Sequence, residues 1–157
     1  MTGFTMVELI VAIAVAGILL GIGVPSYRSF VAGQRIRTAT SELNYALLQA
    51  RSEAIKRNAA VTVTPAGSCW QAGWTVSVGS VALAAQGAYR DLSFAASSSA
   101  TSGVTFNGEG RIDGSDAAIQ IASRTARDVS SRCVALDLSG LPSTTTTACR
   151  LSVVNCP

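Results

Sequence analysis

Glu8 is the residue whose chemistry most needs an explanation in this sequence. It is the only charged residue in the 21-residue run from Phe4 to Val24, which otherwise holds apolar and small side chains with one threonine. A carboxylate inside a membrane-length apolar segment costs roughly 2.5–3.5 kcal/mol on insertion scales. An acid retained there therefore indicates a positively charged partner or another specific role.

The four cysteines are the other candidates for bond-forming chemistry. Cys69, Cys133, Cys149 and Cys156 form no Cys-x-x-Cys pair, which argues against a zinc ribbon or a redox motif. An even number of cysteines in an exported domain predicts two disulfides. Four cysteines allow three pairings, so their spacing has to be considered.

The cysteine spacing favours one of these pairings. If Ser139–Pro142 is a hairpin turn, Cys133 and Cys149 lie equally far from Leu141 and could face each other. The segment between Cys149 and Cys156 is expected to be extended, which would hold these two cysteines too far apart to form a disulfide. We therefore favour Cys133–Cys149 together with Cys69–Cys156.

Catalysis is not expected from this composition. The chain has no histidine, which excludes Ser-His-Asp triads, histidine-based acid–base catalysis and histidine metal sites. Serine, aspartate and arginine occur, but no Ser-x-x-Lys or other lysine-based nucleophile signature accompanies them. The sequence therefore predicts neither an enzyme nor a bound cofactor or metal ion.

The element that positions Glu8 is an apolar helix of membrane length. Phe4–Val24 would be roughly 31 Å long as a helix, close to the hydrocarbon thickness of about 30 Å. A plain signal peptide fits poorly, because the run is long, carries an acid and has no small-x-small site before Pro25. An ordinary membrane anchor explains the length but leaves Glu8 unexplained.

A third interpretation accounts for both features. The stretch Gly3-Phe4-Thr5-Met6-Val7-Glu8-Leu9-Ile10 resembles the class III signal of type IV pilins and type II secretion pseudopilins. The resemblance implies cleavage by prepilin peptidase between Gly3 and Phe4 and N-methylation of Phe4. Glu8 would then pair with the amino terminus of a neighbouring subunit. The leader 1–3 lacks the usual Lys or Arg, so either its α-amino group supplies the positive charge or the true start lies upstream.

A second helical half is predicted from Ser26 to about Asn58. Its apolar residues recur at three- and four-residue spacing, which is typical of a helix that covers a sheet. We expect one long helix that is bent or kinked near Pro25. The residues of the stripe are Ile36, Ala39, Leu43, Leu47, Ala50 and Ala54.

The remainder of the chain reads as short strands and turns. Gly73-Trp74 resembles the Gly-Trp element of the FimT/FimU/GspH family of minor pilins and pseudopilins, and Val104–Ile112 resembles the strand and glycine turn of that family. We expect Trp70 and Trp74 to be core residues; a stacking platform for nucleic acid or sugar is the alternative. The Ser/Ala-rich stretch 95–103 is expected to be a mobile loop.

The predicted fold class is therefore α+β and type IV pilin-like, with the long N-terminal helix packed on a small antiparallel sheet. Four segments are expected: a leader peptide (1–3), a transmembrane and filament-core helix (4–25), an amphipathic helix (26–58) and a β-rich globular domain (59–157).

The charge distribution argues against strong DNA binding. Residues 28–57 hold six basic and two acidic residues, whereas residues 58–157 hold six of each. DNA-binding FimT-like members carry a Gly-Arg-x-Arg motif after the last strand, where this chain keeps Gly140 but has neither arginine. A DNA site would have to use four other arginines, which have acids among them: Arg111, Arg124, Arg127 and Arg132.

The resemblance implies a minor pilin that primes and assembles type IV pili, at or near the pilus tip, in adhesion and twitching motility. Its partners would be other major and minor pilins, prepilin peptidase and the inner-membrane assembly platform. It would cross the inner membrane once, with a periplasmic globular domain, and then enter the surface pilus. The alternatives are a GspH-like pseudopilin of type II secretion and, from another class, a DNA-binding competence pilin.

Overall fold

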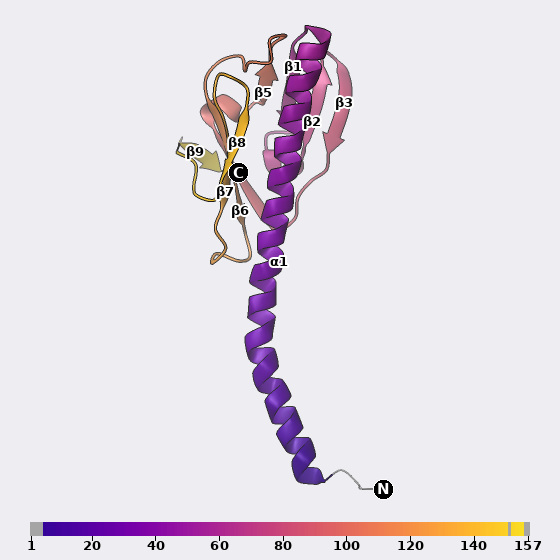
Figure 1. Ribbon diagram of the computed structural model, residues 1–157, viewed down its shortest axis with the longest axis vertical. Helices are drawn as coiled ribbons and strands as arrows, with labels where there is room; N and C mark the ends of the chain where they lie inside the picture. Colours follow the sequence, from indigo (N-terminus) through magenta and orange to yellow (C-terminus); the bar gives the residue numbers. More distant parts are fainter. Residues whose placement is uncertain (1–4, 151, 156–157) are drawn as a thin grey trace.

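The computed structural model describes residues 5–150 and 152–155. One long helix, α1 (Met6–Arg57), runs from an isolated lower end and packs with its upper part against a β-rich domain, whose strands lie behind it and on both sides (Figure 1). The strands are β1 (Val61–Pro65), β2 (Trp74–Val78), β3 (Val81–Gln86), β4 (Leu92–Ser97), β5 (Val104–Phe106), β6 (Ala117–Ser123), β7 (Arg132–Leu136), β8 (Pro142–Thr145) and β9 (Val153–Asn155).

Helix α1 is continuous over 52 residues, which corresponds to roughly 78 Å at about 1.5 Å per residue. The Thr5 side chain caps it by accepting a hydrogen bond from the backbone N–H of Glu8 at 3.3 Å. It ends at Asn58, whose left-handed conformation (φ 47°) lets its N–H reach the carbonyls of the last turn. Pro25 lies inside this uninterrupted helix, which is gently curved as a whole and shows no break (Figure 1).

The strands form two antiparallel sheets, whereas the sequence predicted one. The first has the order β3-β2-β1-β5 and the second the order β8-β7-β6-β4-β9. Both sheets contact the upper part of α1, mainly through β1, β6, β7 and β8. The six residues of the predicted apolar stripe are all buried there. One helix face thus fills the space between two sheets.

The two tryptophans are core residues, as predicted. Trp70 is 1% exposed and Trp74 is 2% exposed, and their ring centroids lie 6.2 Å apart. The Trp70 indole N–H donates to the carbonyl of Ala100 at 2.8 Å, which satisfies its one polar group. The rings of Tyr89 and Phe94 complete the cluster. A stacking platform needs exposed ring faces, so that alternative is wrong.

The loop predicted over residues 95–103 is also wrong for most of its length. Strand β4 continues to Ser97 and is followed by a 3-10 turn, Ser98–Ala100. β4 lies between β6 and β9, and Ala95, Ala96 and Ala100 are buried. The Ser97 hydroxyl accepts from the backbone N–H of Ala118 at 3.0 Å. Small side chains fit this inner strand because they allow close packing, although their composition suggests a loop.

The Cys133–Cys149 disulfide is confirmed, with 5.1 Å between the Cα atoms. Its geometry differs from the expected one, because Cys133 lies opposite Thr145 in the β7–β8 ladder. The chain passes the end of β8 before Cys149 returns toward β7, where its N–H donates to the Gln120 side chain at 3.2 Å. The pairing Cys69–Cys156 stays a prediction, since Cys156 lies outside the described residues.

Candidate functional site

Helix α1 has two halves with opposite environments. We call Met6–Arg28 the lower half and Ser29–Arg57 the upper half. Every residue of the lower half is exposed; Leu20, for example, is 64% exposed, whereas Leu43 in the upper half is fully buried. Within the described part of the chain, α1 is the one helix long and apolar enough to cross a membrane. The lower half is therefore a largely apolar surface that no other described part of the chain covers.

Glu8 lies in the first turn of this exposed segment. A carboxylate is favourable there because the N-terminal end of a helix carries partial positive charge. Among the described residues Glu8 forms no ion pair, and its side chain is open to a neighbour. Gly3 and Phe4, the predicted processing residues, lie outside the described residues.

The two halves meet where the globular domain begins. The Ser29 hydroxyl lies 2.6 Å from a carboxylate oxygen of Asp128, in the loop between β6 and β7, and 3.3 Å from the carbonyl of Pro25. Gly33 faces Val129 of the same loop, and a Cβ at Gly33 would lie 3.7 Å from that side chain. Pro25 therefore lies one turn below the first contact between the helix and the domain.

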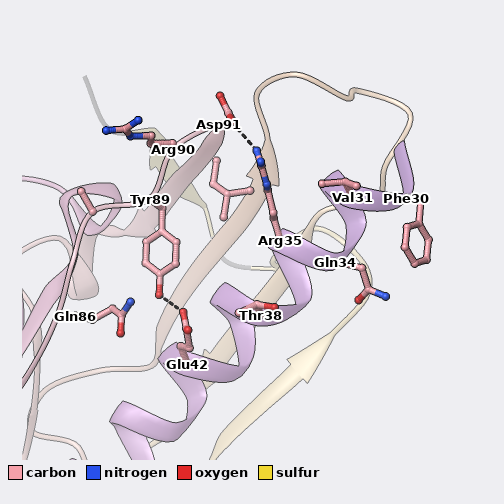
Figure 2. Close-up of a pocket in the computed structure, with 12 residues that line it drawn as sticks. Phe30, Val31, Gln34, Arg35, Thr38, Glu42, Gln86, Tyr89, Arg90 and Asp91 are labelled. Atoms are coloured by element: carbon pink, nitrogen blue, oxygen red, sulfur yellow. Dashed lines mark hydrogen bonds and ion pairs between the residues drawn. The ribbon is translucent and has the colours of Figure 1, made fainter. Parts of the chain in front are cut away.

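A hollow of about 660 Å³ lies between α1 and the segment that joins β3 to β4. Two polar contacts cross it (Figure 2). The Tyr89 hydroxyl donates to Glu42, and Arg35 forms an ion pair with Asp91 at 2.6 Å. Burial, followed by the hydrogen bond to Glu42, raises the pKa of the Tyr89 phenol above its ordinary value. The phenol is therefore held protonated, and both contacts fasten the segment to the upper half.

Comparison with known proteins decides the family. Residues 39–140 match the family model described as type II transport protein GspH, which covers more than half of the chain. The chain belongs to the GspH family.

Solved structures show the same fold. Two crystal forms of the type IV minor pilin FimU from Pseudomonas aeruginosa superpose on this GspH-family protein with TM-scores of 0.64 and 0.61, at 22% identity. They cover 74% and 69% of this chain, and 92% and 91% of the FimU chains. The predicted pilin-like α+β fold is therefore confirmed.

Sequence relatives overlap less of the chain. Two proteins of Pseudomonas aeruginosa described as fimbrial protein are 32% identical over 76 residues, which is 48% of this chain. The GspH-family protein spans about half the length of these relatives, 49% in each case.

Three of the four arginines considered for DNA, Arg124, Arg127 and Arg132, lie in or beside the β6–β7 loop of this GspH-family protein, whereas Arg111 lies apart from them. Arg111 lies in the turn after β5, beside Gly110, whose carbonyl accepts from Arg51 of α1 at 2.9 Å. Arg124 and Arg127 lie in the loop that bonds Ser29. Ser29 and Arg51 are 22 residues apart on α1, or roughly 33 Å. Arg111 is therefore at the opposite end of the domain from the β6–β7 loop, whose far end leads to Arg132 at the start of β7.

Gly140, which occupies the glycine position of the DNA-binding motif, has a structural role. Its φ is +74°, a left-handed conformation that favours glycine. A Cβ there would lie 2.2 Å from the carbonyl oxygen of Gly110. The glycine thus permits two turns to touch, and one of them accepts the bond from Arg51. Its presence is explained by this contact without any nucleic acid.

The two polar contacts across the hollow, which we call the clamps, were not predicted from the sequence. Arg35 and Asp91 are separated by 56 residues, and Glu42 and Tyr89 by 47. No local pattern links residues so far apart. The one hint in the sequence was the pair Tyr89 and Asp91. They lie close together between two short apolar segments, in a stretch that has no strand pattern of its own.

Proposed function

We propose that this protein is a minor pilin that takes part in priming and assembly of type IV pili, at or near the pilus tip, and thereby in adhesion and twitching motility. The observation that carries this proposal is the exposed lower half of α1, which is apolar from Leu9 to Val24. It is continuous with an upper half that buries one face in the domain. Such a surface needs lipid or neighbouring helices around it. The fold shared with the minor pilin FimU supports the same conclusion.

The segments would act in sequence. Prepilin peptidase removes 1–3 and exposes Phe4, and residues 4–25 hold the chain in the inner membrane. The amphipathic part, 26–58, and the β-rich part, 59–157, stay in the periplasm until assembly. The lower half then leaves the lipid and packs among helices of other pilins in the filament core. Glu8 neutralises the amino terminus of a neighbouring subunit, which offsets the cost of burying both charges.

A GspH-like pseudopilin of type II secretion is the second candidate, and the family description favours it. The fimbrial relatives and the FimU fold favour the pilus. A DNA-binding competence pilin has less support, because Leu141 and Ser143 stand where the two arginines of the motif would be needed. No enzymatic activity belongs to the proposal.

Intact-mass analysis of the protein from its native host tests the proposal. Sheared surface filaments and membranes are separated, and the mass is measured in each. We expect a chain that begins at N-methylated Phe4 and lacks four hydrogens, present in the filament fraction. A processed chain confined to membranes would favour the pseudopilin. A chain that still begins at Met1 would contradict both.

A deletion strain separates the two systems. Loss of surface pili and twitching with normal protein secretion supports the pilus, and the reverse result supports type II secretion. Complementation with Glu8→Gln should fail to restore assembly although the protein accumulates in the membrane. Complementation with Glu109→Gln, an exposed acid at the far end of the domain, is the matched control and should succeed.

A further inference from the structure

The fold separates charges that are balanced in number over residues 58–157. Where the lower half of α1 enters the domain, arginines from the helix, the β3–β4 segment and the β6–β7 loop come to the same level. Ser29 bonds Asp128, Arg35 bonds Asp91, and the N–H of Arg124 donates to the carbonyl of Asp91 at 2.9 Å. We call this set the basic collar; its members are Arg28, Arg35, Arg37, Arg90, Arg124, Arg127 and Arg132.

The collar carries a net positive charge. Its seven arginines are accompanied by three acids: Asp91, Asp128 and Glu42, which lines the same hollow as Arg35 and Arg90. Four positive charges remain. Among the described residues, Arg35 is the collar member with a carboxylate within ion-pair distance. Two unpaired guanidinium groups, Arg37 and Arg132, line one hollow beside Gly33. The charge is therefore available to an outside partner.

The opposite end of the domain is different. It holds four basic residues against five acids, a net charge of minus one, and three of its charged residues form ion pairs among themselves at the end of α1. The near-neutral composition of residues 58–157 thus hides a strong polarity along the helix axis. A sequence count cannot reveal it, because arginines of the collar come from segments up to about 100 residues apart.

The collar lies at a membrane-like boundary. Arg28 follows the end of the apolar run by one turn of helix, and Tyr27 and Phe30 on either side of it are 68% and 62% exposed. Aromatic side chains with adjacent basic residues are typical of the level at which a helix leaves the hydrocarbon and enters the headgroups. Two independent features, charge and exposed aromatic rings, therefore mark the same level.

We propose that the basic collar binds the phosphates of anionic phospholipids on the outer face of the membrane that α1 crosses, and so holds the globular domain against the bilayer before assembly. The inference rests on the proposed membrane-anchored pilin. Guanidinium groups bind phosphate oxygens well, and arginines near an anionic bilayer surface add to one another. A DNA duplex fits less well, because the collar faces the bilayer while the lower half is inserted.

The test uses the full-length chain in lipid nanodiscs, made of phosphatidylcholine alone or with one third phosphatidylglycerol. Amide hydrogen exchange is measured in the loop 124–130 and, as an internal reference, in the turn 109–115 at the far end. At low salt we expect exchange in the first segment to be at least threefold slower with phosphatidylglycerol. The reference should not change, and 0.5 M salt should abolish the difference.

Two charge-matched variants assign the effect to the collar. The double variant Arg124→Gln/Arg127→Gln should lose most of the protection, since two arginines contribute roughly 30-fold to binding near an anionic surface. The control Lys56→Gln/Arg111→Gln removes two charges from the far end and should retain it. Tryptophan emission from buried Trp70 verifies that each variant is folded.

The outcomes separate this inference from the function beneath it. If the chain does not enter the discs, the membrane anchor and the inference both fail. If it enters but the loop exchanges equally in both lipids, the collar does not bind lipid and the pilin proposal stands. Protection of the loop by added duplex DNA in phosphatidylcholine discs, without protection by phosphatidylglycerol, would overturn lipid binding in favour of DNA.

Discussion

The two halves of α1 share one uninterrupted helix and differ in almost everything around it. The upper half buries a stripe that includes Ile36, Leu43 and Leu47 between two sheets. The lower half exposes apolar side chains on all sides, Ile13 at 63% among them. Backbone hydrogen bonding is the same in both, so secondary structure does not distinguish them. The difference lies in the partner, which the domain provides for one half only.

Their side-chain patterns follow the same division. A helix with one apolar stripe packs against one surface, whereas a helix that is apolar on all sides is surrounded by protein or lipid. The upper half belongs to the first class and the lower half to the second. Stability of the domain should therefore depend on the upper half and assembly on the lower half, which matched substitutions can test.

The largest contrast is expected from leucine-to-alanine substitutions in the two halves. Leu47→Ala removes a fully buried side chain and should lower the free energy of unfolding by about 3 kcal/mol. Leu20→Ala removes a side chain that has no partner in the chain and should leave it unchanged. Urea unfolding of the detergent-solubilised protein, followed by tryptophan fluorescence, measures both. Equal losses in the two variants would show that the halves are not independent.

Glycine substitutions should give the next largest contrast. Gly140→Ala places a Cβ 2.2 Å from the Gly110 carbonyl at a φ of +74°, and should cost about 2 kcal/mol or more. A Cβ at Gly21 would have no atom within 4 Å, so Gly21→Ala should increase the stability of the helix by up to about 1 kcal/mol. The proposed filament core predicts that Gly21→Ala nevertheless reduces piliation.

The same urea assay and a count of surface pili in the complemented strain measure the two glycine effects. The expected pattern is reciprocal: a less stable domain for one variant, and fewer pili with unchanged domain stability for the other. Normal piliation by Gly21→Ala would mean that close approach of helices at that glycine is unnecessary.

Most of the helix could be predicted from sequence because its signals are periodic. Ile36, Leu43 and Leu47 recur at helical spacing over many turns, and this repetition decides element and face together. The apolar run to Val24 is recognised from length alone. Pro25 misled in part, because a proline predicts a kink, whereas a long helix can absorb one lost hydrogen bond with gentle curvature.

The sheets and the collar were harder to predict for a physical reason. Ala95–Ser97 became an inner strand because β6 and β9 lie on either side of it, and neither neighbour is close in sequence. Cys133 forms a disulfide with Cys149 although Thr145 lies opposite Cys133 in the ladder, because the chain beyond β8 turns back. Both outcomes depend on long-range pairing, which local composition does not encode. Division of the strands into two sheets has the same cause.

A smaller effect is expected at the clamp between the upper half and the β3–β4 segment. Tyr89→Phe removes the hydroxyl that donates to Glu42 and should cost about 1 kcal/mol, because the site is only partly buried. Tyr45→Phe is the control on the same half: Tyr45 is 68% exposed, and its loss should not be measurable. The difference between the two urea midpoints measures the clamp. No difference would mean that water replaces Glu42 as the partner of the phenol without loss.

The smallest effect should appear at the upper end of α1, in a dependence on pH. The hydrogen bond from Arg57 holds the pKa of Glu53 below its ordinary value of 4.5. A carboxyl with a lowered pKa in the folded state stabilises the protein above its unfolded pKa, and that contribution is lost as pH falls through the folded value. Between pH 7 and pH 3 the parent protein should therefore lose slightly more stability than Glu53→Gln. The difference should shrink in 1 M salt because the pair is open to solvent. Identical pH profiles would mean that this ion pair does not stabilise the end of the upper half.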